Sequence, residues 1–112
     1  MTFDDLFQQE YDRRRNNCLH FTALAWKFLT GDDRLDTIKE HAFHEWRGIM
    51  RKFTRQPGVT ESPSVALMET VDGREHIGIC YRRRLLHLTA SGVQFFPVEA
   101  YAGDFVNLRF YQ

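Results

Sequence analysis

The chain has 112 residues, 43% of them hydrophobic, which predicts a single domain over residues 1–112 whose core needs no disulfide or structural metal. Fifteen Lys and Arg balance fifteen Asp and Glu, so the formal net charge is zero and no general basic field would attract nucleic acid. No apolar run approaches the ~20 residues that span a bilayer, so no membrane insertion is expected.

The start of the chain, Met1–Asp5, lacks the basic and apolar regions of a signal peptide, so synthesis in the cytoplasm without a signal peptide is expected. Cys18 and Cys80 stand in a sequence without disulfide-rich character and are expected to be reduced thiols. A disulfide between them is an alternative that nothing in the sequence supports.

The first half of the chain predicts helices. Residues 2–10 have the pattern of a short amphipathic helix, and 11–17 form a polar loop. Residues 18–29 are apolar around most of the helix circumference, which is typical of a central, buried helix. Asn16 or Asn17 is a suitable N-cap for this helix, because its amide oxygen can accept from backbone N–H groups of the first turn.

Glycine and proline residues mark the predicted ends of two helices. Thr30-Gly31 predicts the end of the helix that begins at Cys18. Apolar residues then recur about every 3.5 positions from Leu35 to Arg55, which predicts a second long amphipathic helix ending before Pro57. Gly48 weakens this prediction, since glycine costs up to ~1 kcal/mol relative to alanine inside a helix.

The second half predicts strands in hairpin order. Residues 64–71, 74–81 and 84–90 are short runs rich in Val, Ile, Leu and Tyr, separated by turn residues. Residues 93–98 add a short irregular strand. The expected fold class is therefore α+β, with N-terminal helices packed on one face of a C-terminal antiparallel sheet of about four to five strands.

The last strand is predicted over residues 104–111. Strict alternation would put Phe105 and Tyr111 on one face, and Val106, Leu108 and Phe110 on the other.

Cys18 is predicted to lie in the first turn of its helix. Unpaired N–H groups and the helix dipole at this position favour negative charge, so a lowered thiol pKa and a reactive thiolate are expected. The alternative is structural, because a lone cysteine in an apolar helix usually serves as a small buried hydrophobe.

Two histidines fall in neighbouring predicted strands. If Arg82-Arg83 form a two-residue hairpin loop, His87 lies opposite Gly78 and on the same face as His76. Diagonal neighbours are ~7–8 Å apart at the backbone, within reach of two imidazole rings. A three-residue loop would instead place the two histidines on opposite faces.

These residues predict a site for covalent acyl chemistry, provided that the cysteine helix packs on the face that carries the histidines. Cys18 is the expected nucleophile, His76 the base that takes its proton, and His87 the group that orients His76. The backbone N–H of Cys18 would stabilise the oxyanion.

A zinc site is an alternative interpretation of the cysteines and histidines. The prediction, however, is that the protein has no metal site and no cofactor. The sequence contains neither Cys-x-x-Cys nor His-Glu-x-x-His. Cys80 is interpreted as a packing residue, and His20 as a half-exposed neighbour of the sheet edge or loop. The candidate zinc ligands are Cys18, His20, His41, His44 and Cys80.

Several short motifs together resemble the NlpC/P60 cysteine peptidases, specifically the small versions encoded with phage tail genes. The motifs are Asn17-Cys18-Leu19-His20-Phe21 with Trp26, His76-Ile77-Gly78-Ile79, Leu85-Leu86-His87-Leu88, and Gly92-Val93-Gln94.

The resemblance implies a papain-like core and cleavage of amide bonds in peptidoglycan stem peptides, with Cys18, His76 and His87 as the catalytic residues. Many members have a tyrosine shortly before the cysteine that helps bind the substrate carbonyl, and Tyr11 is the nearest candidate here. The sequence departs from many members at Leu19-His20, where Ser-Gly is frequent.

Asn17 and Gly78 complete the candidate substrate-binding set with Tyr11. The expected partners are the peptidoglycan peptide and phage tail proteins, with the protein located in a virion tail or delivered to the periplasm. The alternative function is that of a non-catalytic tail or tail-tip assembly protein that keeps the same fold.

Overall fold

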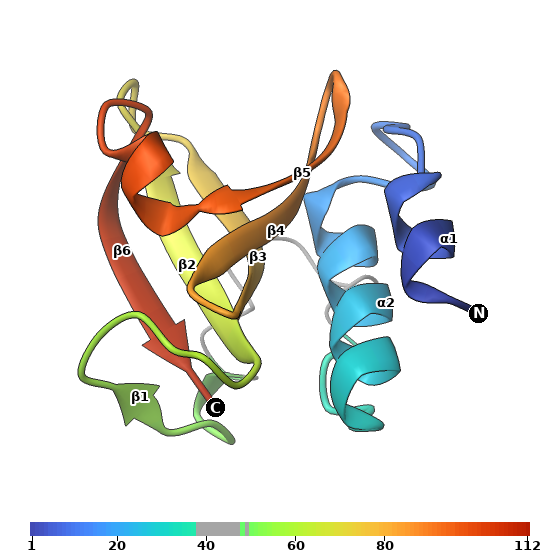
Figure 1. Cartoon of the computed structure of the whole chain (residues 1–112), viewed down its shortest axis with the longest axis horizontal. Helices are drawn as coiled ribbons and strands as arrows, with labels where there is room; N and C mark the ends of the chain where they lie inside the picture. Colours follow the sequence, from blue (N-terminus) through green and yellow to red (C-terminus); the bar gives the residue numbers. More distant parts are fainter. Residues whose placement is uncertain (38–47, 49) are drawn as a thin grey trace.

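The computed structural model describes residues 1–37, 48 and 50–112 (Figure 1). In this described part, two α-helices lie on one side of a six-stranded antiparallel sheet, so the expected α+β class is confirmed. The strand order is β1-β6-β2-β3-β4-β5, in which β2 to β5 form a meander and β6 returns to the free edge of β2. The elements are α1 Phe3–Phe7, α2 Cys18–Thr30, β1 Arg55–Gln56, β2 Ser64–Thr70, β3 Glu75–Tyr81, β4 Arg84–Thr89, β5 Gly92–Pro97, the 3-10 helix η3 Val98–Tyr101, and β6 Phe105–Tyr111.

Both helices carry side-chain caps. In α1, Thr2 and Asp5 form a reciprocal capping box, and the helix ends at Phe7 rather than at residue 10 as predicted. Asn17 caps α2, accepting from the N–H groups of Leu19 and His20 at 3.0 and 3.2 Å. The left-handed Gly31 ends α2 with φ 75°, so the predicted bounds of this helix are confirmed within one residue.

The predicted helix from Leu35 to Arg55 lies largely outside the described residues. Leu35 is in a turn and Phe53 in a bend, and both side chains join the core beneath α2. Arg55 was predicted to be the helix end, which is wrong: it pairs with Tyr111 in β1. This pairing uses the otherwise open edge of β6 and adds a strand to the four or five that were expected.

The β3–β4 hairpin has the two-residue loop that the sequence predicted. Arg82 and Arg83 have φ values of 52° and 61°, the left-handed conformations of a type I′ turn. The ladder pairs Tyr81 with Arg84, and continues to Ile79 with Leu86. Beyond that pair the strands run on toward Gly78 and His87, where the candidate site lies.

Strand β6 contains a β-bulge. The register with β2 shifts between Leu67 and Glu69, and Asn107 opposite has φ 55°. The extra residue reverses which face the following side chains occupy, so Phe105 packs on the same side as Leu108 and Phe110. The predicted grouping of Phe105 with Tyr111 was therefore wrong, because strict alternation does not anticipate a bulge.

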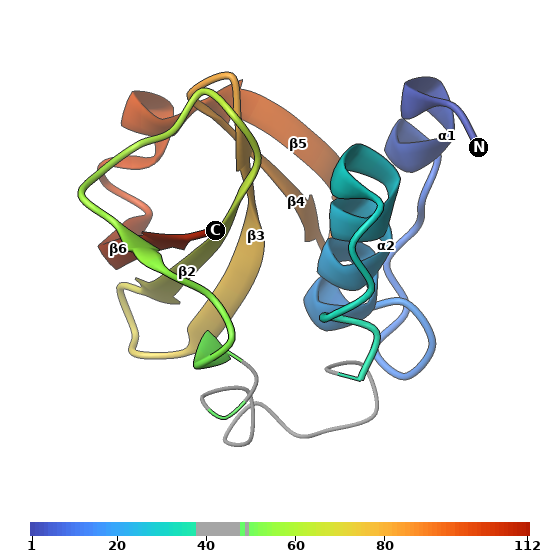
Figure 2. The same cartoon turned by 90° about the horizontal axis from the view of Figure 1, so that it is seen from below.

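The sheet is apolar on both faces. On the face toward the helices, Ile77, Ile79, Leu86 and Leu88 pack in one cluster with the buried residues of α2. The helix lies alongside β3 and β4 (Figure 2). The other face of the sheet carries a smaller hydrophobic cluster, which η3 covers through the buried Tyr101. The buried members of this cluster are Ala66, Met68, Cys80, Leu85, Tyr101 and Phe110. Within the described residues, no helix is long and apolar enough to cross a membrane.

Candidate active site

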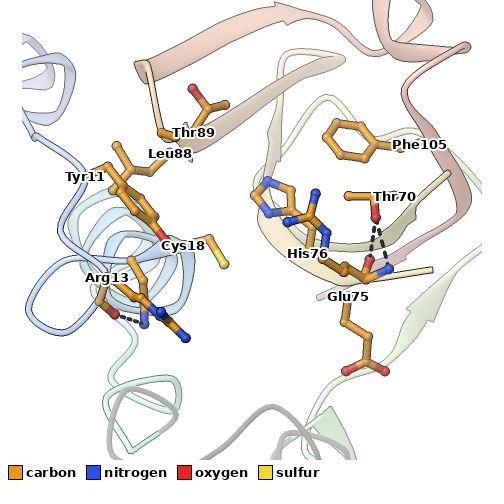
Figure 3. Close-up of a pocket in the computed structure, with 12 residues that line it drawn as sticks. Tyr11, Arg13, Cys18, Thr70, Glu75, His76, Leu88, Thr89 and Phe105 are labelled. Carbon is orange, nitrogen blue, oxygen red and sulfur yellow. Dashed lines mark hydrogen bonds between the residues drawn. The ribbon is translucent and has the colours of Figure 1, made fainter. Parts of the chain in front are cut away.

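Cys18 and His76 line one cavity of ≈630 Å³ (Figure 3). Tyr11 and Arg13 line it from the loop before α2, next to Cys18. Thr70, at the end of β2, and Phe105, at the start of β6, line it near His76. The thiol points into the space between the helix start and the sheet, so the cavity brings together the nucleophile and the base that the sequence predicted.

His76 and His87 form a hydrogen-bonded pair. Nε2 of His76 lies 2.9 Å from Nδ1 of His87, and the ring planes are inclined at 77°. The predicted same-face arrangement is therefore confirmed. Gly78 makes it possible, since a Cβ at this position would lie 2.9 Å from both Cβ of His87 and the carbonyl oxygen of Leu86. On its other side His76 stacks on Phe105, with ring centroids 5.3 Å apart and planes within 8°.

The helix packs on the other face of the sheet from the one that was expected. Alternation along β3 puts His76, Gly78 and Cys80 on the face away from α2, while Ile77 and Ile79 face the helix. Cys18 and His76 nevertheless meet at one cavity, because each lies at the end of its element. Cys18 is the first residue of α2, and His76 is the second of β3.

Burial raises the pKa of the Cys18 thiol, although the backbone N–H groups of Ile77, Cys18 and Leu19 act in the opposite direction. The predicted lowering of this pKa was therefore wrong. Packing of the helix start against β3 removes water that would solvate a thiolate, and this cost exceeds the gain from the helix N-terminus. The resting group at neutral pH is a thiol.

Both histidines are neutral at pH 7. Burial, followed by the nearby Arg74 guanidinium, lowers the pKa of His76 to about 4. Burial, followed by the charge of His76, lowers the pKa of His87 to about 3, and a contact with Gln94 opposes this shift. A neutral imidazole has one donor and one acceptor nitrogen, so His76 can take a proton from a thiol.

The three candidate substrate-binding residues occupy different positions. Tyr11 is 43% exposed and lines the cavity. Asn17 also lines it, but its amide oxygen is engaged in capping α2 and its NH₂ group donates to the carbonyl of Arg13. Gly78 is fully buried beneath His87 and makes room for that ring.

The other sulfur and imidazole groups have structural roles. Both cysteines are free, and the buried Cys80 lies in the core face away from α2, with its thiol directed at the carbonyl of Thr60, which confirms its interpretation as a packing residue. Nδ1 of His20 accepts from the N–H of Asn17 and closes the capping box. In the described part of the chain no group of three or more His, Cys, Asp or Glu could hold a metal. His41 and His44 lie outside the described residues.

Sequence reasoning gave no role in the site to three residues that lie next to the histidine pair: Gln94, Tyr101 and Phe105. A signal existed for Gln94, because a two-residue turn at Ala90-Ser91 places it directly opposite His87. Phe105 could not be found in this way, since the bulge in β6 reverses its face.

Comparisons with protein-family models, with curated proteins and with solved structures give no match to this chain. The geometry of the site and the short motifs that resemble NlpC/P60 peptidases are therefore the only pointers to function.

Proposed function

We propose that this protein is a cysteine peptidase or amidase with a papain-like, NlpC/P60-like core that hydrolyses amide bonds in peptidoglycan stem peptides. One observation carries the proposal: a hydrogen-bonded His76–His87 pair shares a cavity with Cys18, the first residue of α2. A nucleophile, a base and a group that holds the base are the parts that covalent acyl transfer requires.

The reaction begins from a neutral thiol and a neutral imidazole. Nε2 of His76 is engaged by His87, which leaves Nδ1 for the thiol. As the sulfur attacks the amide carbon, Nδ1 takes the proton, because the raised thiol pKa does not favour a thiolate beforehand. The backbone N–H of Cys18 donates to the oxyanion.

Collapse of the tetrahedral intermediate breaks the C–N bond and leaves an acyl group on Cys18 as a thioester. His76 returns its proton to the departing amine. Water then attacks the thioester with His76 as base, which releases the acid and restores the thiol. No step requires a metal or an organic cofactor.

The charge around the cavity favours a peptide substrate that carries a carboxylate. Arg13 and Arg74 both line the cavity, together with Glu75. Arg74 also contacts Asp72 at 3.2 Å, so Arg13, on the cysteine side, is the residue that we expect to bind a substrate carboxylate. Tyr11 lies beside it and would contact the substrate backbone. Delivery by a phage tail, or into the periplasm, would bring such a site to the cell wall.

A second candidate is a non-catalytic tail or tail-tip assembly protein with the same fold. The observation in its favour is that the partly buried Cys18 thiol has a raised pKa, which is also expected of an idle cysteine. Phage tail proteins would then be the partners, and no peptide would be cleaved.

Incubation of the purified protein with intact peptidoglycan, followed by mass spectrometry of the soluble fragments, separates the two candidates. The peptidase predicts fragments with new amino and carboxyl termini inside the stem peptide. The assembly protein predicts none, and complete absence of such fragments with correctly folded protein would refute the peptidase.

A further inference from the structure

The proposed mechanism uses only one of the two ring nitrogens of His87, the Nδ1 atom that contacts His76. Nε2 of His87 is buried and makes no hydrogen bond of normal length to any residue that the structure describes. The residue itself is fully buried. Because Nδ1 is engaged by His76, the proton on His87 must lie either on Nδ1, between the rings, or on Nε2.

Gln94 lies beside His87. It is the direct cross-strand partner of His87 in the β4–β5 ladder. The hydroxyl of Tyr101 donates to Oε1 of Gln94 at 3.0 Å, and the Tyr101 ring meets the His87 ring edge-on at 5.0 Å. The Tyr101 donor therefore fixes which end of the Gln94 amide is the oxygen, and this carbonyl oxygen keeps a second lone pair for another donor. Gln94 also raises the pKa of His87, as an acceptor near its N–H would.

We propose that Gln94 is a positioning residue that fixes the tautomers of both histidines, an inference that rests on the proposed cysteine peptidase function. After a small rotation of the amide, Oε1 of Gln94 accepts a hydrogen bond from the N–H at Nε2 of His87. Nδ1 of His87 then accepts a hydrogen bond from the N–H at Nε2 of His76. His76 therefore presents an unprotonated Nδ1 to the thiol.

The opposite arrangement would disable the base. If His87 carried its proton on Nδ1, it would donate to Nε2 of His76, and the single proton of His76 would lie on Nδ1. A protonated Nδ1 cannot accept the thiol proton. The function of Gln94 is therefore to select between two arrangements that place the same heavy atoms in the same positions.

Nitrogen-15 NMR of the histidine rings tests the tautomers without any substrate. The measurement is made at pH 8, well above the pKa values of about 4 and about 3 of the two rings. Wild-type protein is expected to show N–H on Nε2 of both His76 and His87. In the Gln94→Leu variant, which removes the acceptor, a substantial share of both protons is expected to move to Nδ1. Wild-type rings protonated on Nδ1, or tautomers unchanged in Gln94→Leu, would overturn the proposal.

Kinetics on a stem peptide provide the second arm. Gln94→Leu is expected to lower kcat by about tenfold or more, as is typical when a supporting partner of a functional histidine is lost. KM should be unchanged, because Gln94 is not among the residues that line the cavity. Gln94→Glu keeps the acceptor oxygen and is expected to retain the wild-type tautomers and most of kcat.

The two arms distinguish two failures. Predicted tautomers without hydrolysis by the wild type would refute the peptidase function and leave the tautomer assignment supported. Hydrolysis with equal kcat in wild type and Gln94→Leu would refute the role of Gln94 alone. Loss of kcat in Gln94→Glu as well, with the tautomers retained, would also contradict that role.

Discussion

Replacing Gly78 with alanine should destabilise the protein and displace His87. The added Cβ would lie 2.9 Å from Cβ of His87, 2.9 Å from the carbonyl oxygen of Leu86, and 3.3 Å from Cδ1 of Leu85. Two of these atoms belong to the backbone or are fixed to it, so β4 as a whole must move away from β3. Overpacking of this kind typically costs 1–3 kcal/mol, and the rigid neighbours here point to about 2 kcal/mol.

Thermal and urea denaturation measure this cost. At roughly 4 °C per kcal/mol for a domain of this size, Gly78→Ala should lower Tm by about 8 °C. Gly103→Ala is the matched control, because a Cβ there has no atom within 4 Å, and its stability should be unchanged or slightly raised. Displacing His87 should also weaken its hydrogen bond to His76 and lower kcat. A Gly78→Ala protein as stable as Gly103→Ala would refute the reasoning.

Three further predictions concern pH, the thiols and the helix cap. Stability should fall as pH drops from 6.5 to 4.5, because the folded-state pKa values of about 4 for His76 and about 3 for His87 lie below the unfolded value of ~6.5. The loss for His76 over this range is about 2 kcal/mol, and urea midpoints that stay constant from pH 6.5 to 4.5 would contradict the burial of neutral rings. The rate of Cys18 alkylation should still be rising above pH 9, while Cys80 stays unlabelled in the native protein; a plateau near pH 7 would disprove the raised thiol pKa. Asn17→Ala should cost about 1–2 kcal/mol in urea denaturation and Asn17→Asp much less, and equal losses would show that the cap oxygen does not matter.

The histidine pair could be predicted from sequence because it depends on local rules. A two-residue turn at Arg82-Arg83 fixes the register of β3 against β4, and the register fixes which side chains meet. His87 and Gly78 follow from counting alone. The cap of α2 was similarly local, since Asn17 and Gly31 each satisfy backbone groups of the residues beside them.

The face on which α2 packs could not be predicted, because both faces of β3 are buried and apolar. Ile77 and Ile79 lie on one side, and Gly78 and Cys80 on the other, so periodicity gives no preference. The raised pKa of the Cys18 thiol could not be predicted for a similar reason, because it too depends on tertiary packing. A helix N-terminus is visible in sequence, whereas desolvation of Cys18 depends on what packs against it.

The most direct test of nucleophilic catalysis by Cys18 is the rate of amide hydrolysis in a stem peptide by the wild type and by Cys18→Ala, with Cys80→Ala as the control thiol. We predict a loss of about 10³-fold or more for Cys18→Ala, as is typical when a nucleophile that acts with its base is removed. Cys80→Ala should keep most of the rate, because Cys80 packs in the core face away from α2. Hydrolysis by Cys18→Ala at the wild-type rate would contradict the account.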